Sequence, residues 1–174
     1  NNSAYGGTFI TSGGGFSATF AAPEYQTAAV AGFLNDAKEN TFGPGYNEKG
    51  RGYPDVALIG HLYPIFVGGE PEVKDGTSAS TPVMAGIIAL VNSVRIAAGK
   101  SSVGFANPAL YGWAGDASIF HDISEGDNSC CAATQLVPTK DVTCCAENGF
   151  RAVKGWDPVT GLGSINAGNL IEAW

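Results

Sequence analysis

The chain has 174 residues, of which 44% are hydrophobic, and this is enough for one compact domain or a large part of one. Its 9 basic and 16 acidic residues give a net charge of −7, which argues against nucleic acid or an anionic membrane as a partner. No uninterrupted apolar run is long enough to span a bilayer, because Asn92, Ser93 and Arg95 interrupt the longest one.

The first part of the chain alternates between β-prone and helical patterns. Residues 6–20 hold short β-prone pieces around three consecutive glycines, which predicts a strand, a glycine turn and an extended segment. Residues 22–40 carry apolar side chains at helical spacing and predict an amphipathic helix. Residues 41–53 are expected to form a loop. A buried strand is expected at 54–60 and a short apolar strand at 63–68, followed by a polar segment at 69–75.

The longest apolar run predicts a helix over residues 80–98. Pro82 suits its first turn, and Gly99 suits the position after its end. Because this helix is apolar on all sides until Asn92, it is expected to be buried in the middle of a domain.

The C-terminal part continues the alternation of helices and short strands. A short helix is expected from about Pro108 and a strand over 120–124. A cysteine-rich loop then runs to residue 151, followed by a glycine-rich turn and a final helix. Helices that alternate with short apolar strands indicate an α/β domain.

Ser78 precedes the predicted buried helix, where free backbone N–H groups and the positive end of the helix dipole gather. A developing oxyanion would be stabilised there, and a serine hydroxyl could be held ready for attack. The alternative is that Thr77, Ser78 and Ser80 only cap the helix, since Ser and Thr are favoured N-cap residues. The local pattern by itself favours capping.

Four cysteines in one loop predict two disulfides in an oxidising compartment. A zinc site is the weaker alternative, because the usual Cys-x-x-Cys spacing is absent and adjacent cysteines poorly surround a tetrahedral ion. Four cysteines allow three pairings, and the sequence leaves the pairing open. The residues are Cys130, Cys131, Cys144 and Cys145.

Asp122 and Asp157 bracket the cysteine-rich loop and could offer oxygen ligands to a hard cation, although both also suit a turn or a cap. The two histidines, His61 and His121, do not lie in settings that suggest a general base, and structural roles are favoured for both. A nucleophilic Ser78 would therefore need a carboxylate as its base.

Six motifs resemble, in this order along the chain, the sedolisin family of serine-carboxyl peptidases, and above all its tripeptidyl-peptidase-like members. They span essentially the whole chain and reverse the capping interpretation of Ser78. The motifs are SGGGFSATFAAPEYQ (12–26), GRGYPDVAL (50–58), DGTSASTPVMAGIIALVN (75–92), GFANPALY (104–111), DIS with the following Gly126 and Asn128 (122–128), and GWDPVTGLGSIN (155–166).

The resemblance implies a subtilisin-like, three-layer α/β fold with a mostly parallel sheet, of which residues 1–174 would form the C-terminal portion. It implies peptide hydrolysis in acid, with Ser78 as the acylated nucleophile. In this family a glutamate serves as base, an aspartate supports it, and a further aspartate donates a hydrogen bond to the oxyanion, which a carboxyl group can do only while protonated.

The resemblance also implies one calcium ion in a region at about 120–160. Its ligands would be two carboxylates and three carbonyl groups, namely the side chains of Asp122 and Asp157 and the carbonyls of Ile123, Val153 and Gly155.

The family's glutamate and two aspartates precede the Ser-Gly-Gly-Gly segment and have no counterpart upstream of Ser12. Glu70, Glu72 and Asp75 are too near Ser78 in sequence to replace them. The chain is therefore expected to be about half of a catalytic domain, inactive alone and completed by an N-terminal chain that carries the three carboxyl groups.

The complete enzyme is expected to cleave peptide or protein substrates, as a tripeptidyl-peptidase or an endopeptidase. An acidic, oxidising location is expected, either secreted or lysosomal/vacuolar. The alternative is a catalytically silent, calcium-binding domain that keeps the subtilisin-like fold and binds other proteins.

Overall fold

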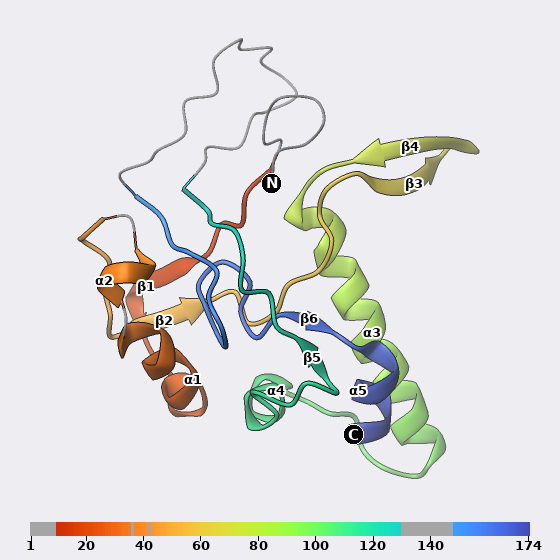
Figure 1. Ribbon diagram of the computed structural model, residues 1–174. Coiled ribbons are helices and arrows are strands. Elements are labelled where there is room, and N and C mark those ends of the chain that lie inside the picture. The colour runs from red at the N-terminus through yellow and green to blue at the C-terminus, as the bar shows by residue number, and fades with distance from the viewer. Residues whose placement is uncertain (1–9, 36, 42, 130–147) are drawn as a thin grey trace.

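A computed structural model of the chain describes residues 10–35, 37–41, 43–129 and 148–174. Helices and short strands alternate along it, as expected for an α/β protein (Figure 1). The described strands form three separate two-stranded sheets, and all three are antiparallel. The α/β class is therefore confirmed, whereas the mostly parallel sheet does not form among the described residues.

The N-terminal sheet pairs β1 (Gly15–Ala21) with β2 (Gly50–Tyr53). The expected loop at 41–53 is wrong at its end, where β2 forms. Its glycines permit close packing, because a Cβ atom on Gly52 would lie 2.4 Å from the ring of Trp156. The expected helix at 22–40 forms as α1 (Glu24–Asn35) and α2 (Ala37–Asn40), and α1 buries Val30 and Phe33.

An aromatic core joins the N-terminal and C-terminal segments. Phe16 stacks on Tyr46 with ring centroids 5.0 Å apart, and it meets Trp156 edge-on at 5.9 Å. Phe33 also meets Trp156 edge-on, at 6.1 Å. Such pairs contribute beyond the burial of their apolar surface. This core fixes residues 148–162 against α1 and β1.

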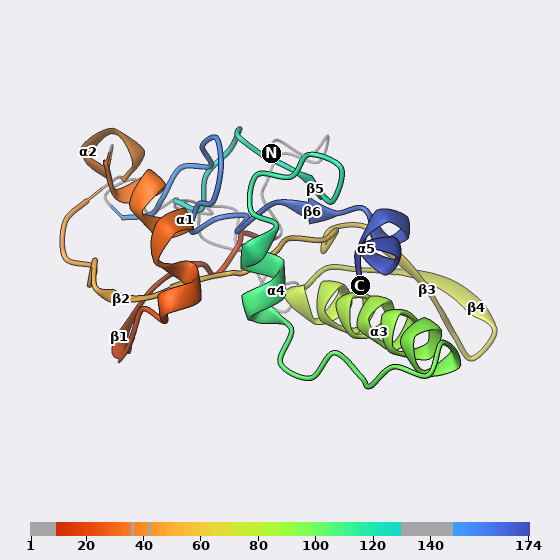
Figure 2. The same ribbon diagram turned by 90° about the horizontal axis from the view of Figure 1, so that it is seen from below.

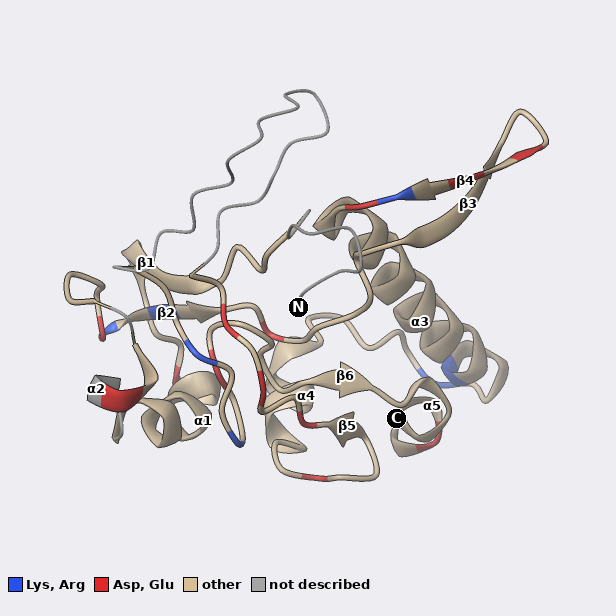
Figure 3. Cartoon of the chain, turned by 45° about the horizontal axis from the view of Figure 1, so that its top comes forward, with Lys and Arg blue, Asp and Glu red and all other residues tan. Residues whose placement is uncertain are grey.

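β3 (Tyr63–Val67) confirms the strand expected at 63–68, and it pairs in a hairpin with β4 (Glu70–Lys74), which forms within the polar segment expected at 69–75. Gly68 and Gly69 form its two-residue turn with φ of 61° and 91°, the left-handed conformations that such turns require. The hairpin projects from the N-terminal end of α3 (Thr77–Ala97), and its charged side chains lie on β4 and at the turn (Figure 3).

Helix α3 forms where a helix was expected but is not buried. Val91 is its one buried residue, and Leu90, Val94 and Ile96 are each more than half exposed. The reason is that, among the described elements, α3 packs mainly against α5 (Ala167–Ala173), which covers only its C-terminal part (Figure 2). Length and composition would also allow α3 to cross a membrane, contrary to the expectation from the interrupted run. Core helices of soluble proteins pass the same test.

Residues 54–60 do not form the expected strand. Ala57 makes one parallel bridge to Ser164, and Ile59 is 72% exposed. The carbonyls of residues 58–60 instead accept hydrogen bonds from residues 76 and 80, beside the start of α3. Backbone groups used in this way cannot pair with a neighbouring strand.

The remaining elements are short. Helix α4 (Asn107–Gly112) begins within one residue of the expected position, and α5 confirms the final helix. The strand expected at 120–124 is reduced to β5 (Phe120–His121), which pairs with β6 (Ser164–Ile165). This small sheet places Asp122 and residues 153–163 on neighbouring segments.

Candidate active site

Ser78 lies in the first turn of α3, not before the helix as expected. The N-cap is Gly76, with φ of 152°, and no side chain makes a cap hydrogen bond. Thr81 donates to the Thr77 carbonyl at 2.8 Å, and Ser80 donates to residues 58 and 59. Capping therefore does not explain these hydroxyl groups. The exposed Ser78 side chain is left available for chemistry.

A cavity of about 470 Å³ adjoins Ser78, between the β3–β4 hairpin and the first turns of α3. Its wall is mostly apolar and includes Tyr63, Ile65, Pro82 and Val83. Lys74 and Asp75 add charged groups. An apolar cavity with a few polar groups beside a hydroxyl is the usual form of a site for a small apolar group.

Asp75 lines the same cavity as Ser78. Its carboxylate is already used: Oδ1 accepts the Leu62 N–H at 2.7 Å and lies 2.8 Å from His61 Nδ1. Within the described part of the chain, no carboxylate or imidazole makes a hydrogen bond to the Ser78 hydroxyl. The contact of His61 with Asp75 was missed, and the only signal was the position of Asp75 directly before Gly76-Thr77-Ser78.

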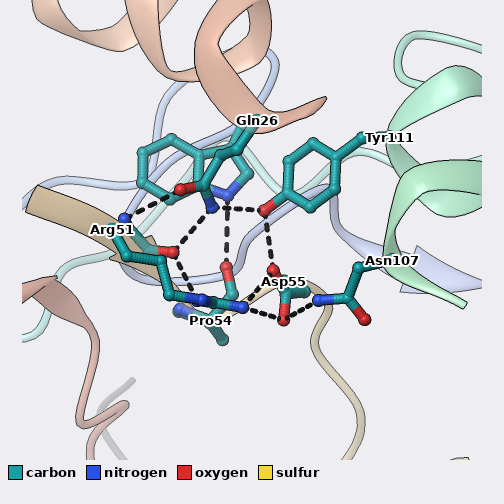
Figure 4. Close-up of polar contacts among 8 residues, drawn as sticks. Gln26, Arg51, Pro54, Asp55, Asn107 and Tyr111 are labelled. Atoms are coloured by element: carbon teal, nitrogen blue, oxygen red, sulfur yellow. Dashed lines mark hydrogen bonds and ion pairs between the residues drawn. The ribbon is translucent and has the colours of Figure 1, made fainter. Parts of the chain in front are cut away.

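A polar network around Gln26 and Asp55 holds the start of residues 54–60 (Figure 4). Gln26 is fully buried; its amide donates to the Gly52 carbonyl and to the Tyr111 hydroxyl, each at 2.7 Å, and accepts the Gly52 N–H. Tyr111 in turn donates to Asp55 at 2.9 Å, and Arg51 binds both Asp55 oxygens. Burial and then the Asp55 carboxylate raise the pKa of Tyr111, so its proton stays in the network.

The five residues expected to bind calcium lie together in the structure. Gly155 N–H donates to Asp122 at 2.8 Å, and Val153 N–H donates to Asp157 at 3.0 Å. The Thr160 hydroxyl joins the Ile123 carbonyl, at 3.3 Å, to Asp157. No group of three or more His, Cys, Asp or Glu side chains suited to a metal occurs in the described residues. The expected ligand set contains only two carboxylates, so it depends on carbonyl groups.

Asp157 is fully buried, and among the described residues its hydrogen-bond donors are all neutral: the backbone N–H groups of residues 153, 159 and 160 and the Thr160 hydroxyl. Burial raises the pKa of Asp157, and these hydrogen bonds oppose the shift. A bound cation would offset the cost of burying this charge, and the surrounding oxygen atoms are the ligand type that calcium prefers. The expected ligands therefore have the donor chemistry that calcium accepts. The four cysteines lie outside the described residues, and their disulfides stay a prediction.

Comparisons with known proteins give the chain its family. No family model matches it. It is 47% identical to physarolisin of Physarum polycephalum over 89% of its own length, 40% identical to aorsin of Aspergillus oryzae over 94%, and 39% identical to tripeptidyl-peptidase 1 of Macaca fascicularis over 92%. The chain therefore belongs to the sedolisin family. It spans about a quarter of the length of these relatives, namely 25%, 24% and 27%.

Proposed function

We propose that the chain is the serine-bearing part of an acid-active serine-carboxyl peptidase. The observation that carries this proposal is the exposed Ser78, which opens onto an apolar cavity from the first turn of α3 and is not used as a cap. The kinship with physarolisin, aorsin and tripeptidyl-peptidases supports peptide bonds as the target. The enzyme would act as a tripeptidyl-peptidase or as an endopeptidase.

In the proposed reaction the Ser78 oxygen attacks the scissile carbonyl carbon. A carboxylate base takes the hydroxyl proton and passes it to the leaving amine as the C–N bond breaks. Water then hydrolyses the ester on Ser78 and regenerates the hydroxyl. The apolar cavity beside Ser78 accepts a side chain of the peptide, since Tyr63, Ile65 and Pro82 line it.

The base, its supporting aspartate and the oxyanion aspartate are proposed to come from an N-terminal chain. This is supported by the hydrogen bonds of Asp75, whose Oδ1 is already committed to residues 61 and 62. The oxyanion carboxyl must carry a proton to donate a hydrogen bond, so the enzyme is proposed to be active at acidic pH. Its proposed location is therefore acidic: secreted, lysosomal or vacuolar.

We expect the isolated chain to be inert towards peptides at every pH, because it holds the nucleophile without its base. Adding the portion with the three carboxyl groups should restore hydrolysis in acid, and the rate should fall as the pH rises towards neutral. A fluorogenic peptide assay over a pH series measures both. Hydrolysis by the isolated chain would contradict the missing base. A well-assembled, inert complex would favour the silent binding domain.

One calcium ion is proposed to bind the side chains of Asp122 and Asp157 and the carbonyls of Ile123, Val153 and Gly155. The ion would neutralise the buried Asp157 carboxylate and join the segment after β5 to residues 153–157. Its role is therefore stabilisation of the C-terminal segment, because anything that binds only the folded chain raises its stability by mass action.

The calcium site is best tested at Asp122, because Asp157 also accepts several internal hydrogen bonds and its loss would disturb the fold by itself. We expect Asp122→Asn to weaken calcium binding by at least about tenfold, since it removes one of two charged ligands. Calorimetric titration with CaCl₂ measures the affinity. Asp116→Asn, a change in an exposed carboxylate that binds Ser118 and is not an expected ligand, should leave affinity unchanged. A melting temperature indifferent to EDTA and to calcium would rule the site out.

A further inference from the structure

Hydrogen bonds join two neighbouring segments, residues 58–62 and residues 75–80, around the start of α3. Ser78 lies within the second segment. We propose that Asp75 and Ser80 are positioning residues for the Ser78 hydroxyl, and that they act by locking the turn at Gly76 onto residues 58–62. This inference rests on the proposed role of Ser78 as nucleophile.

Ser80 makes the hydrogen bonds on the helical side of Ser78. Its one hydroxyl proton is shared between the carbonyls of Leu58, with Oγ at 3.2 Å, and Ile59, at 3.0 Å. The next carbonyl, that of Gly60, accepts the Gly76 N–H at 2.7 Å. The approach is close: a Cβ atom on Gly60 would lie 2.9 Å from Ser80 Oγ and 3.0 Å from the Gly76 oxygen. Three consecutive carbonyls thus hold the first turn of α3.

Asp75 makes the hydrogen bonds on the N-terminal side of Ser78. One oxygen, Oδ1, accepts the Leu62 N–H at 2.7 Å and lies 2.8 Å from His61 Nδ1. Leu62 has φ of 50° and is the one non-glycine residue in the described part of the chain with a positive φ. The left-handed conformation is unfavourable for a leucine. The Asp75 carboxylate stabilises this turn and so keeps residues 60–62 in place beside Gly76.

Ser78 lies between these two sets of hydrogen bonds, three residues after Asp75 and two before Ser80. The Ser78 hydroxyl itself makes no hydrogen bond to the residues that the structure describes, so its direction is set by the backbone of this turn. A nucleophile displaced by about 1 Å can lose about 100-fold in rate. Loss of the Asp75 or the Ser80 hydrogen bonds should therefore slow acylation and leave substrate affinity nearly unchanged.

The test uses the assembled enzyme and compares two substitutions at Asp75. We expect Asp75→Ala to lower kcat by about 10- to 100-fold with KM within about twofold. Asp75→Asn keeps an oxygen that can accept the Leu62 N–H, and it should retain most of the rate. Ser80→Ala should repeat the loss in kcat. Glu70→Gln, a change at an exposed position next to the turn of the same hairpin, should leave both constants unchanged.

Single-turnover acylation and melting curves accompany each variant, so that loss of folded protein is separated from slow chemistry. Unchanged kcat in Asp75→Ala and Ser80→Ala would overturn the inference. Equal losses of kcat in Asp75→Asn and Asp75→Ala would also overturn it, because the charge of Asp75 would then matter instead of its hydrogen bond with the Leu62 N–H. Activity that survives Ser78→Ala is a different result, since it would remove the proposed nucleophile itself.

Discussion

Ser78→Ala is expected to abolish peptide hydrolysis by the assembled enzyme, with kcat falling at least about 10⁴-fold, the scale seen when a serine nucleophile is removed. The physical reason is that no acyl-enzyme can form without the hydroxyl oxygen. Steady-state kinetics at acidic pH measure the loss. Calcium affinity and the melting temperature should stay close to those of the unmodified enzyme.

The fold should tolerate this change because the Ser78 side chain is exposed and does not cap α3. Alanine also favours a helix, so the free energy of unfolding should change by less than about 0.5 kcal/mol. Ser93→Ala is the matched control, since Ser93 is another exposed serine of the same helix. Loss of activity in Ser93→Ala, or its survival in Ser78→Ala, would contradict the assignment.

The largest effect on stability is expected at Gln26. Gln26→Leu keeps a side chain of similar size but removes three hydrogen bonds, two with Gly52 and one with Tyr111. The buried Gly52 N–H would then have no acceptor. We expect the free energy of unfolding to fall by about 3 kcal/mol, since an unsatisfied buried group is added to the lost bonds. Urea denaturation monitored by tryptophan fluorescence measures it.

Thr27→Ala provides the control for this measurement. Thr27 is the next residue of α1, it is exposed, and its hydroxyl makes only a 3.3 Å bond to the Pro23 carbonyl. Its replacement should change stability by no more than about 0.5 kcal/mol. Equal, small effects at Gln26 and Thr27 would show that the network in Figure 4 does not stabilise the fold.

Local patterns predicted the helices well and the strands poorly. α1, α3 and α5 follow from apolar spacing and end signals that lie within the segments themselves. β2 and β4 were missed because a strand depends on a partner elsewhere in the chain: β2 pairs with β1, and β4 with β3 across Gly68-Gly69. Residues 54–60 have a strand-like apolar sequence, yet their carbonyls bind Ser80 and Gly76, which no local pattern reveals.

The burial of α3 could not be predicted from composition. An apolar sequence indicates that a helix surface favours burial. The fraction of that surface that is buried depends on the elements packed against it, and α5 covers only part of α3. Asp122 accepts a hydrogen bond from the Gly155 N–H, whereas the calcium ligand set, which came from the family resemblance, stays a prediction. The contact of His61 with Asp75 spans 14 residues and depends on the shape of the hairpin, so the position of Asp75 before Gly76 was its only signal in the sequence.

The central claim, that Ser78 carries the acyl group, is tested most directly by trapping the acyl-enzyme. The assembled enzyme is mixed with a peptide substrate at acidic pH, quenched in strong acid within one turnover, digested and mapped by mass spectrometry. Cleavage after Lys74 and Arg95 releases residues 75–95 as one fragment. We expect one acyl group on this fragment, located at Ser78 by fragmentation and absent from Ser78→Ala. An acyl group on any other residue would contradict the assignment.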